Sequence, residues 1–171
     1  YQNLRAYKQT KHKLAFGWYG SWTAVGASYQ SRLISAPDSM DIISIWSQWH
    51  TLTPQQKADK EFVQKTLGTK VTYTIFSDKL PEPFLEIGNG EYTDEAIEAY
   101  AKAYCKDSMD KYQYDGIDID YEPGYGASGP FVGHDNALFT KLINAMSKYV
   151  GPKSGTGRLL IIDGVPYAVD R

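Results

Sequence analysis

The chain has 171 residues, a formal net charge of −2 and one cysteine, and 42% of its residues are hydrophobic. This length suggests a single domain, and the near-zero charge gives no electrostatic reason to expect a nucleic acid or an anionic membrane as partner. No apolar run approaches the roughly 20 residues that a membrane span needs, and a single cysteine excludes an internal disulfide.

The first half of the chain alternates predicted strands and helices. Residues 13–19 (KLAFGWY) and 41–47 (DIISIWS) predict strands, the second covered on both faces, and residues 27–35 predict a short helix between them. A further helix is predicted from Thr53, Pro54 and Gln56, which form a capping box with proline at the first helical position. Gly68 is placed to end that helix.

The second half continues the alternation. Its predicted elements are, in chain order, a strand at 70–76 (KVTYTIF), a long helix capped by Thr93, an acidic strand at 114–123, a glycine-rich loop at 124–133, a helix capped by Asp135 and a strand at 158–165 (RLLIIDGV).

The resulting order, β-α-β-α-β-α-β-α-β, predicts parallel strands joined by helical crossovers. An open doubly wound sheet and a β/α barrel both fit this order, and a barrel of about 250 residues would take only five of its eight strands from this chain. The sequence contains no GxGxxG, Walker, HExxH or GxSxG motif, and its three histidines are scattered. We therefore expect no cofactor and no histidine-based metal site.

The acidic strand, YDGIDIDYEP, alternates two kinds of side chain. Successive residues of a strand point to opposite faces. One face carries Gly116, Asp118, Asp120 and Glu122, and the other carries Ile117, Ile119 and Tyr121. Acids that crowd together in a poorly solvated place must retain or share protons, and such groups are typical of sites that use them chemically.

The same segment could also be an exposed edge strand, a calcium-binding loop or a Mg²⁺ site. An exposed edge strand could alternate Ile and Asp without any function, but a position between two helical crossovers argues that both faces are covered. An EF-hand loop requires Gly where Pro123 stands and Glu where Gly129 stands, so that interpretation fails. A Mg²⁺ site on the carboxylates stays open as an alternative.

The spacing of the acids restricts the kind of glycosidase that they could serve. Asp120 and Glu122 are about 6.6 Å apart along the strand and approach from the same side. A carboxylate nucleophile would have to face the acid across the sugar. The spacing favours one proton donor, Glu122, with Asp120 as helper, and leaves the nucleophile to come from elsewhere, the substrate included.

Residues 115–122 (DGIDIDYE) resemble the DGxDxDxE signature of glycoside hydrolase family 18, which contains chitinases and endo-β-N-acetylglucosaminidases. The resemblance implies a (β/α)8 TIM barrel with the signature on its fourth strand, as here, and this chain would supply roughly strands one to five. It implies that Glu122 protonates the leaving oxygen and that the acetamido group of the substrate is the nucleophile. Asp120 would orient that group, Asp118 would share a proton with Asp120, and Asp115 would support them.

Aromatic residues near the predicted strand ends are candidates for stacking on sugar rings. Residues 16–22 (FGWYGSW) resemble the aromatic first strand of the family. The candidate substrate-binding residues are Trp18, Tyr19, Trp46, Tyr121 and Tyr125, with Trp49 beside them. For each of them, packing in the core is the alternative.

Two departures from the family refine the expected substrate. The SxGG motif of chitinases is absent at residues 73–78 (YTIFSD), and the loop at 123–126 (PGYG) resembles bacterial endoglycosidase members. We therefore expect cleavage within the N,N′-diacetylchitobiose core of N-glycans, with a chitinase or a non-catalytic glycan-binding protein as alternatives. The retained Glu122 favours an enzyme.

The resemblance covers only part of the expected barrel. The tyrosine of the sixth strand and the tryptophan of the eighth, which complete the acetamide pocket in the family, have no place in 171 residues. We expect residues 1–171 to be the N-terminal part of a single catalytic domain, a fragment that is inactive alone. By family analogy the protein would be secreted or attached to the cell surface, and we expect a monomer.

Overall fold

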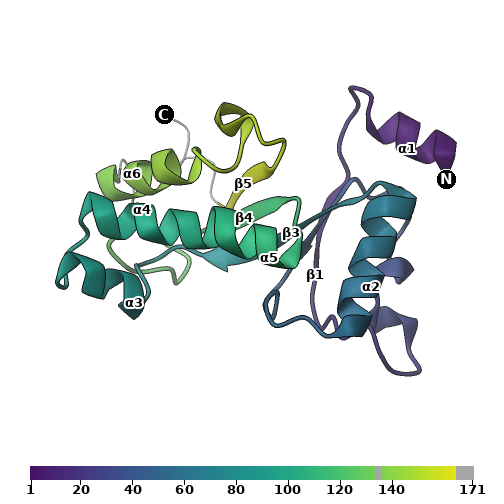
Figure 1. Ribbon diagram of the computed structural model, residues 1–171, viewed down its shortest axis with the longest axis horizontal. Helices are drawn as coiled ribbons and strands as arrows, with labels where there is room; N and C mark the ends of the chain where they lie inside the picture. The colour runs from purple at the N-terminus through teal and green to yellow at the C-terminus, as the bar shows by residue number, and fades with distance from the viewer. Residues whose placement is uncertain (134–135, 165–171) are drawn as a thin grey trace. The chain divides into compact units, whose positions relative to one another are not determined.

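The structure is a computed structural model that describes residues 1–133 and 136–164 (Figure 1). The chain divides into two compact units, residues 1–74 and 75–171. The strands are β1 (Phe16–Tyr19), β2 (Ile42–Ile45), β3 (Lys70–Phe76), β4 (Gly116–Tyr121) and β5 (Leu159–Gly164).

The five strands form one sheet in the order β1-β2-β3-β4-β5, and the pairs β1–β2, β2–β3 and β4–β5 are parallel. The helices are α1 (Gln2–Lys8), α2 (Pro54–Phe62), α3 (Glu82–Leu85), α4 (Asp94–Lys102), α5 (Met109–Tyr112) and α6 (Ala137–Met146). The predicted α/β class with five parallel strands is thereby confirmed. Within the described ranges, no helix is both long and apolar enough to cross a membrane.

Helix α2 begins as its sequence predicts. The Thr53 hydroxyl accepts a hydrogen bond from the backbone N–H of Gln56, and the Gln56 side chain accepts one from the N–H of Thr53. Such a cap stabilises a helix by about 1 kcal/mol. A π-helical segment, Val63–Leu67, continues the helix to Gly68, whose φ of 74° gives the left-handed ending that glycine favours.

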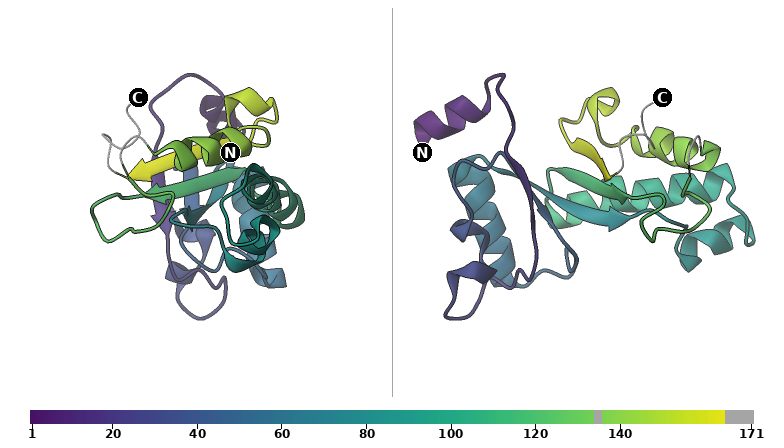
Figure 2. Two further views of the ribbon diagram at one scale, coloured as in Figure 1. Left: turned by 90° about the vertical axis from the view of Figure 1, so that its left-hand side faces the viewer. Right: turned by 180° about the vertical axis from the view of Figure 1, so that it is seen from behind.

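The long helix that follows Thr93 is also present. Helix α4 continues through a π-helical segment, Ala103–Ser108, into α5. Helices α4 and α6 lie side by side (Figures 1 and 2). Two ion pairs join their surfaces, Lys141 with Asp94 at 2.7 Å and Lys148 with Glu98 at 2.6 Å.

Two predicted helix boundaries differ from the structure. Residues 27–35 form two short 3₁₀ turns, Tyr29–Ser31 and Leu33–Ser35, instead of one helix, because the backbone of Arg32 between them is extended. Helix α6 is capped by Asn136, whose side chain accepts a hydrogen bond from the N–H of Phe139. Asp135, predicted as this cap, and Val165, predicted as the end of the last strand, lie outside the described residues.

Strand β4 separates its two faces as the alternation predicts. Ile117 and Ile119 are fully buried, and the Tyr121 ring beyond them stacks on Phe139 of α6 with 3.8 Å between ring centroids. The apolar face of β4 therefore packs against a helix, which leaves the opposite face to the acids.

Glycines at both ends of the β4–β5 pair allow the strands to approach closely. A Cβ on Gly116 would lie 2.5 Å from the carbonyl oxygen of Leu159, its register partner. At the other end, Gly164 has a φ of 139°, and a Cβ there would lie 1.8 Å from the carbonyl oxygen of Tyr121. Neither position has room for a side chain, so the register of the β4–β5 pair is fixed at both ends.

Candidate active site

The three acids of β4 and its end differ in their exposure to solvent. Asp118 is completely buried, Asp120 is partly buried and Glu122 is exposed. Neighbouring acids are about 6.6 Å apart along the strand, because each residue adds about 3.3 Å. The acidic face therefore runs from the interior of the unit to its surface.

The exposed end of this acidic face opens into a pocket with a volume of about 220 Å³. The pocket is lined by Phe76, Asp78, Asp120, Glu122, Tyr125, Gly126 and Ala127. The side chains of Phe76 and Tyr125 are 58% and 70% exposed, so the pocket has two accessible aromatic rings beside its carboxylates. Apolar rings with a few convergent polar groups are typical of ligand sites.

The loop that carries Tyr125 is anchored where it continues to Phe131 and Gly133. The carbonyl oxygen of Asp78 accepts a hydrogen bond from the N–H of Phe131 at 3.0 Å. The buried Tyr121 hydroxyl lies 3.0 Å from the carbonyl oxygen of Phe131 and 2.8 Å from that of Gly133, and it accepts a hydrogen bond from the N–H of Gly133 at 3.2 Å. These bonds hold residues 131–133, the end of the loop that forms the pocket rim, although Tyr125 itself is exposed.

The electrostatics of the acidic face favour retained protons. Burial raises the pKa of Asp120 above its ordinary value, and the charges of Glu122, Asp118 and Asp78 raise it further. Burial also raises the pKa of Asp163 on β5 to about 8, together with a hydrogen bond to Asp118 and the charges of Asp118 and Asp120. Asp163 is therefore protonated at neutral pH.

Three residues of this region escaped the sequence analysis, namely Phe76, Asp78 and Asp163. Asp163 follows the apolar run LLII, and Asp78 lies two residues beyond the end of β3. Polar side chains at the carboxyl ends of parallel strands are where barrel sites are built. That position is the signal which could have identified both acids.

The structure places the other predicted residues of the second unit as follows. Tyr125 lines the pocket with Asp120 and Glu122. Tyr121 is buried against α6, on the face opposite the acids. Asp115 precedes β4 and accepts a hydrogen bond from the N–H of Leu159 through its carbonyl oxygen, so its backbone helps to pair the two strands.

The remaining aromatic candidates belong to the first unit. Trp18 and Trp46 are 50% and 38% exposed. The Tyr19 hydroxyl lies 2.6 Å from the carbonyl oxygen of Arg32, to which it donates a hydrogen bond. Trp49 stacks on Tyr73 at 4.1 Å between ring centroids. Trp18 and Trp46 therefore present accessible surface, whereas Tyr19 and Trp49 hold neighbouring segments.

The carboxylates are also the obvious place to look for a metal ion. Among residues 1–133 and 136–164, no group of three or more His, Cys, Asp or Glu side chains is arranged to hold one. The described residues therefore give the Mg²⁺ alternative no ligand set.

A family model described as "Glycoside hydrolase family 18, BT1044-like" matches residues 1–171. The chain belongs to glycoside hydrolase family 18. Endo-beta-N-acetylglucosaminidase F2 of Elizabethkingia meningoseptica is 31% identical to it over 176 aligned positions, which cover 94% of this chain and 47% of that protein.

A solved structure gives the same family assignment for the fold. It is a selenomethionine form of BT1044 with a glutamate-to-glutamine substitution, and it superimposes with a TM-score of 0.85 at 34% identity. The superposition covers 96% of this chain and 55% of that structure. The chain thus spans about half the length of these two family 18 relatives, and its five strands correspond to part of the (β/α)8 barrel of the family.

Proposed function

We propose that this chain is part of an endo-β-N-acetylglucosaminidase that cleaves within the N,N′-diacetylchitobiose core of N-glycans, with retention of anomeric configuration. The observation that carries the proposal is the pocket in which exposed Glu122 and partly buried Asp120 lie beside two exposed aromatic rings. The similarity to endo-beta-N-acetylglucosaminidase F2 supports this substrate class over chitin.

In the proposed reaction Glu122 acts as general acid and then as general base. Its carboxyl proton passes to the glycosidic oxygen as the bond between that oxygen and the anomeric carbon breaks. The carbonyl oxygen of the 2-acetamido group forms a bond to the same carbon, which gives an oxazolinium ion. Glu122 then takes a proton from the water that opens this ring, so that the acid is regenerated and the configuration is retained.

Asp120 assists the acetamido group in this scheme. Its raised pKa supports a carboxyl that holds a proton until the acetamide nitrogen becomes positively charged. Asp118 lies deeper on the same face and shares a proton with Asp120. The increasing burial from Glu122 to Asp118 supports these roles, because the proton donor must reach the substrate and the buried helper must not.

The test compares a high-mannose glycoprotein with chitin oligomers, using the full-length protein and Glu122→Gln. Loss of a general acid lowers turnover by about 10²- to 10⁴-fold. Glu91→Gln makes the same change at an exposed position outside the pocket and serves as the matched control. If Glu122→Gln releases glycan at the parental rate, the role of Glu122 is wrong. Cleavage of chitin oligomers without cleavage of the glycoprotein would make the protein a chitinase.

Binding of either glycan without any turnover would instead identify a glycan-binding protein on this scaffold. We further propose that the catalytic domain extends beyond residues 1–171, since the match covers only 47% and 55% of the two relatives, and that it acts as a monomer. A preparation that is active, homogeneous and only 171 residues long by intact mass would contradict that extension. Export to meet extracellular glycans is part of the same proposal, and the protein fraction of the culture medium tests it.

A further inference from the structure

Asp163 is an acid of the site that comes from β5 and not from the signature strand β4. In the parallel β4–β5 pair, Asp163 is the register partner of Asp120, and Ile161 is that of Asp118 (Figure 2, yellow β5 beside green β4). Register partners point to the same face of a sheet. Asp163 therefore lies on the acidic face, directly beside Asp120. It is two residues further along the strands than the level of Asp118.

The position of Asp163 is fixed by the close packing of the two strands. Gly164 follows it directly and cannot accept a Cβ, because that atom would lie 1.8 Å from the carbonyl oxygen of Tyr121. Gly116 has the same restriction at the other end of the pair, with 2.5 Å to the carbonyl oxygen of Leu159. A shift of β5 along β4 would bring side chains into these contacts. The carboxyl of Asp163 is thus held opposite the catalytic strand.

Asp118 and Asp163 lie on the same face of two paired strands, and a hydrogen bond to Asp118 is among the causes that raise the pKa of Asp163. Two ionised carboxylates have no hydrogen to share, so one member of the pair must carry a proton. The charged groups around Asp163 are Asp118 and Asp120, and those around Asp120 are Glu122, Asp118 and Asp78, all of them acids. Complete ionisation of this group would place adjacent negative charges in a region where Asp118 has no solvent exposure.

We propose that Asp163 is a positioning residue that carries the proton of the Asp118–Asp163 pair, an inference that rests on the proposed glycosidase function. By donating this proton to the Asp118 carboxylate, Asp163 fixes its orientation from the β5 side. The pair then presents one negative charge to Asp120 instead of two. Asp120 keeps the protonation state that the acetamido group requires, and Asp163 never touches the substrate.

This role predicts a particular dependence of activity on pH. Asp163 is protonated below its pKa of about 8 and loses the proton above it. Activity should therefore decline on the alkaline side as Asp163 ionises. An asparagine keeps an N–H donor at every pH and cannot ionise, whereas an alanine has no donor at all.

Stability gives a second readout that does not depend on catalysis. Because the folded pKa of Asp163 is above the unfolded value of about 3.9, the folded state binds the extra proton and stability falls as pH rises between the two values. Asp163→Asn removes this loss. The variant should therefore melt at a higher temperature than the parent at neutral pH, and the difference should shrink in acid.

The experiment measures kcat/KM against pH for the full-length parent, Asp163→Asn and Asp163→Ala, on the glycan that the parent cleaves. We expect Asp163→Asn to stay within about tenfold of the parent below neutral pH and to lose the alkaline decline. We expect Asp163→Ala to lose about 100-fold below neutral pH, a deficit that should shrink as the parent's Asp163 ionises. Asp38→Asn makes the same change at an exposed position in the other unit and should leave the profile unchanged. Superimposable profiles of the parent and Asp163→Asn would overturn the proposal.

A direct titration separates this inference from the proposed function. Carboxyl ¹³C shifts of the unmodified full-length protein report the ionisation of Asp163 whether or not any glycan is cleaved. A midpoint near 8 supports the shared proton, and a carboxyl already ionised in weak acid overturns it. If the parent cleaves neither glycan while Asp163 titrates near 8, the proposed function fails and the proton pair stands. The same measurement decides the inference if the variants do not fold.

Discussion

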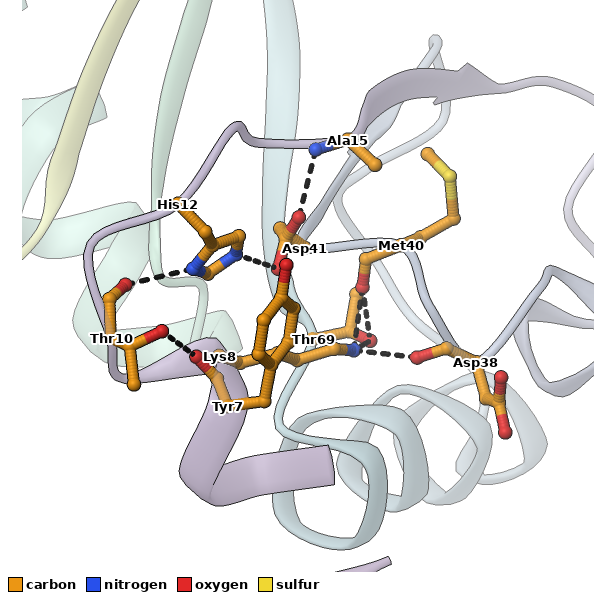
Figure 3. Close-up of polar contacts among 9 residues, drawn as sticks. All are labelled: Tyr7, Lys8, Thr10, His12, Ala15, Asp38, Met40, Asp41 and Thr69. Carbon is orange, nitrogen blue, oxygen red and sulfur yellow. Dashed lines mark hydrogen bonds and ion pairs between the residues drawn. The ribbon is translucent and has the colours of Figure 1, made fainter. Parts of the chain in front are cut away.

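The His12 ring lies between the carbonyl oxygen of Thr10 and the carboxylate of Asp41, and it forms an ion pair with Asp41 when it is protonated (Figure 3). Its Nδ1 lies 2.8 Å from the carbonyl oxygen of Thr10, and its Nε2 lies 3.0 Å from Oδ1 of Asp41. Both partners are acceptors without a hydrogen, so both nitrogens must donate. The second oxygen of Asp41 accepts a hydrogen bond from the N–H of Ala15 at 2.8 Å, which attaches the segment before β1 to the start of β2.

The ion pair predicts how the stability of the first unit depends on pH. The hydrogen bond to Asp41 raises the pKa of His12. The contribution of His12 to stability is therefore complete below its unfolded pKa of about 6.5, and it is lost as pH rises through its folded pKa. Burial raises the pKa of Asp41, but the Ala15 N–H and His12 outweigh it and lower the pKa overall. That contribution is present above about 3.9 and is lost in stronger acid.

The pair is therefore most stabilising between about pH 4 and about pH 6.5. Replacing the ring by an uncharged side chain, His12→Gln, should lower the free energy of unfolding in that window and have progressively less effect in alkali. Urea unfolding at a series of pH values measures the difference, with His50→Gln, an exposed histidine, as the control. A parent–variant difference that stays constant across the whole pH range contradicts the ion pair.

Local sequence signals predicted much of the fold because they act within a few residues. The capping box of Thr53 and Gln56, the glycine that ends its helix and the apolar runs of all five strands are of this kind. Alternation along residues 116–121 also placed Ile117 and Ile119 against the helices and Asp118 on the opposite face.

The features that the sequence did not predict depend on contacts between distant segments. Helix α1 is attached through Lys8, whose Nζ donates to the carbonyl oxygens of Asp38 and Met40 and to the Thr69 hydroxyl (Figure 3). Asp163 lies 45 residues after Asp118 in the chain, and only strand pairing brings the two together. Tyr121 illustrates the reverse case, since its place near a strand end suggested a sugar contact, whereas its ring stacks on Phe139 on the face of the isoleucines.

The glycine pair that fixes β5 against β4 predicts a large cost for adding a methyl group. Gly164→Ala meets the Tyr121 carbonyl oxygen and a φ of 139°, and Gly116→Ala meets that of Leu159. Each should destabilise the protein by about 3 kcal/mol, since overpacking against backbone cannot be relieved by a rotamer change. Denaturant unfolding measures this, and Gly20→Ala, with no atom within 4 Å of its added Cβ, is the control. Equal midpoints for all three variants would contradict a fixed register.

The Tyr121 hydroxyl predicts a link between the core and the pocket rim. Tyr121→Phe keeps the stack on Phe139 but removes a hydroxyl that bonds to Phe131 and Gly133. Loss of these buried bonds should cost about 1–3 kcal/mol and accelerate hydrogen exchange of the Gly133 amide. Tyr29→Phe, at a residue that is 69% exposed, should change neither quantity. Unaltered exchange in Tyr121→Phe would mean that the loop is held by other contacts.

The two exposed rings of the pocket, Phe76 and Tyr125, predict that their removal weakens substrate binding without lowering stability. Covering about 50 Å² of ring by a sugar is worth about 1.3 kcal/mol, so Tyr125→Ala and Phe76→Ala should each raise KM by roughly tenfold. Because Tyr125 is 70% exposed and Phe76 is 58% exposed, neither change removes much packing, and the melting temperature should move little. The measurement is KM and kcat of the full-length protein on the glycan that it cleaves.

The control variants for these two rings keep the aromatic ring and change only the hydroxyl group at its edge. Tyr125→Phe and Phe76→Tyr should both retain the parental KM, because stacking on a sugar uses the face of the ring. If the alanine variants lower kcat and leave KM unchanged, the rings act on the position of the acids and not on the sugar. If KM and kcat are both parental, the pocket beside Glu122 is not where the substrate binds, and the accessible tryptophans Trp18 and Trp46 become the next positions to substitute.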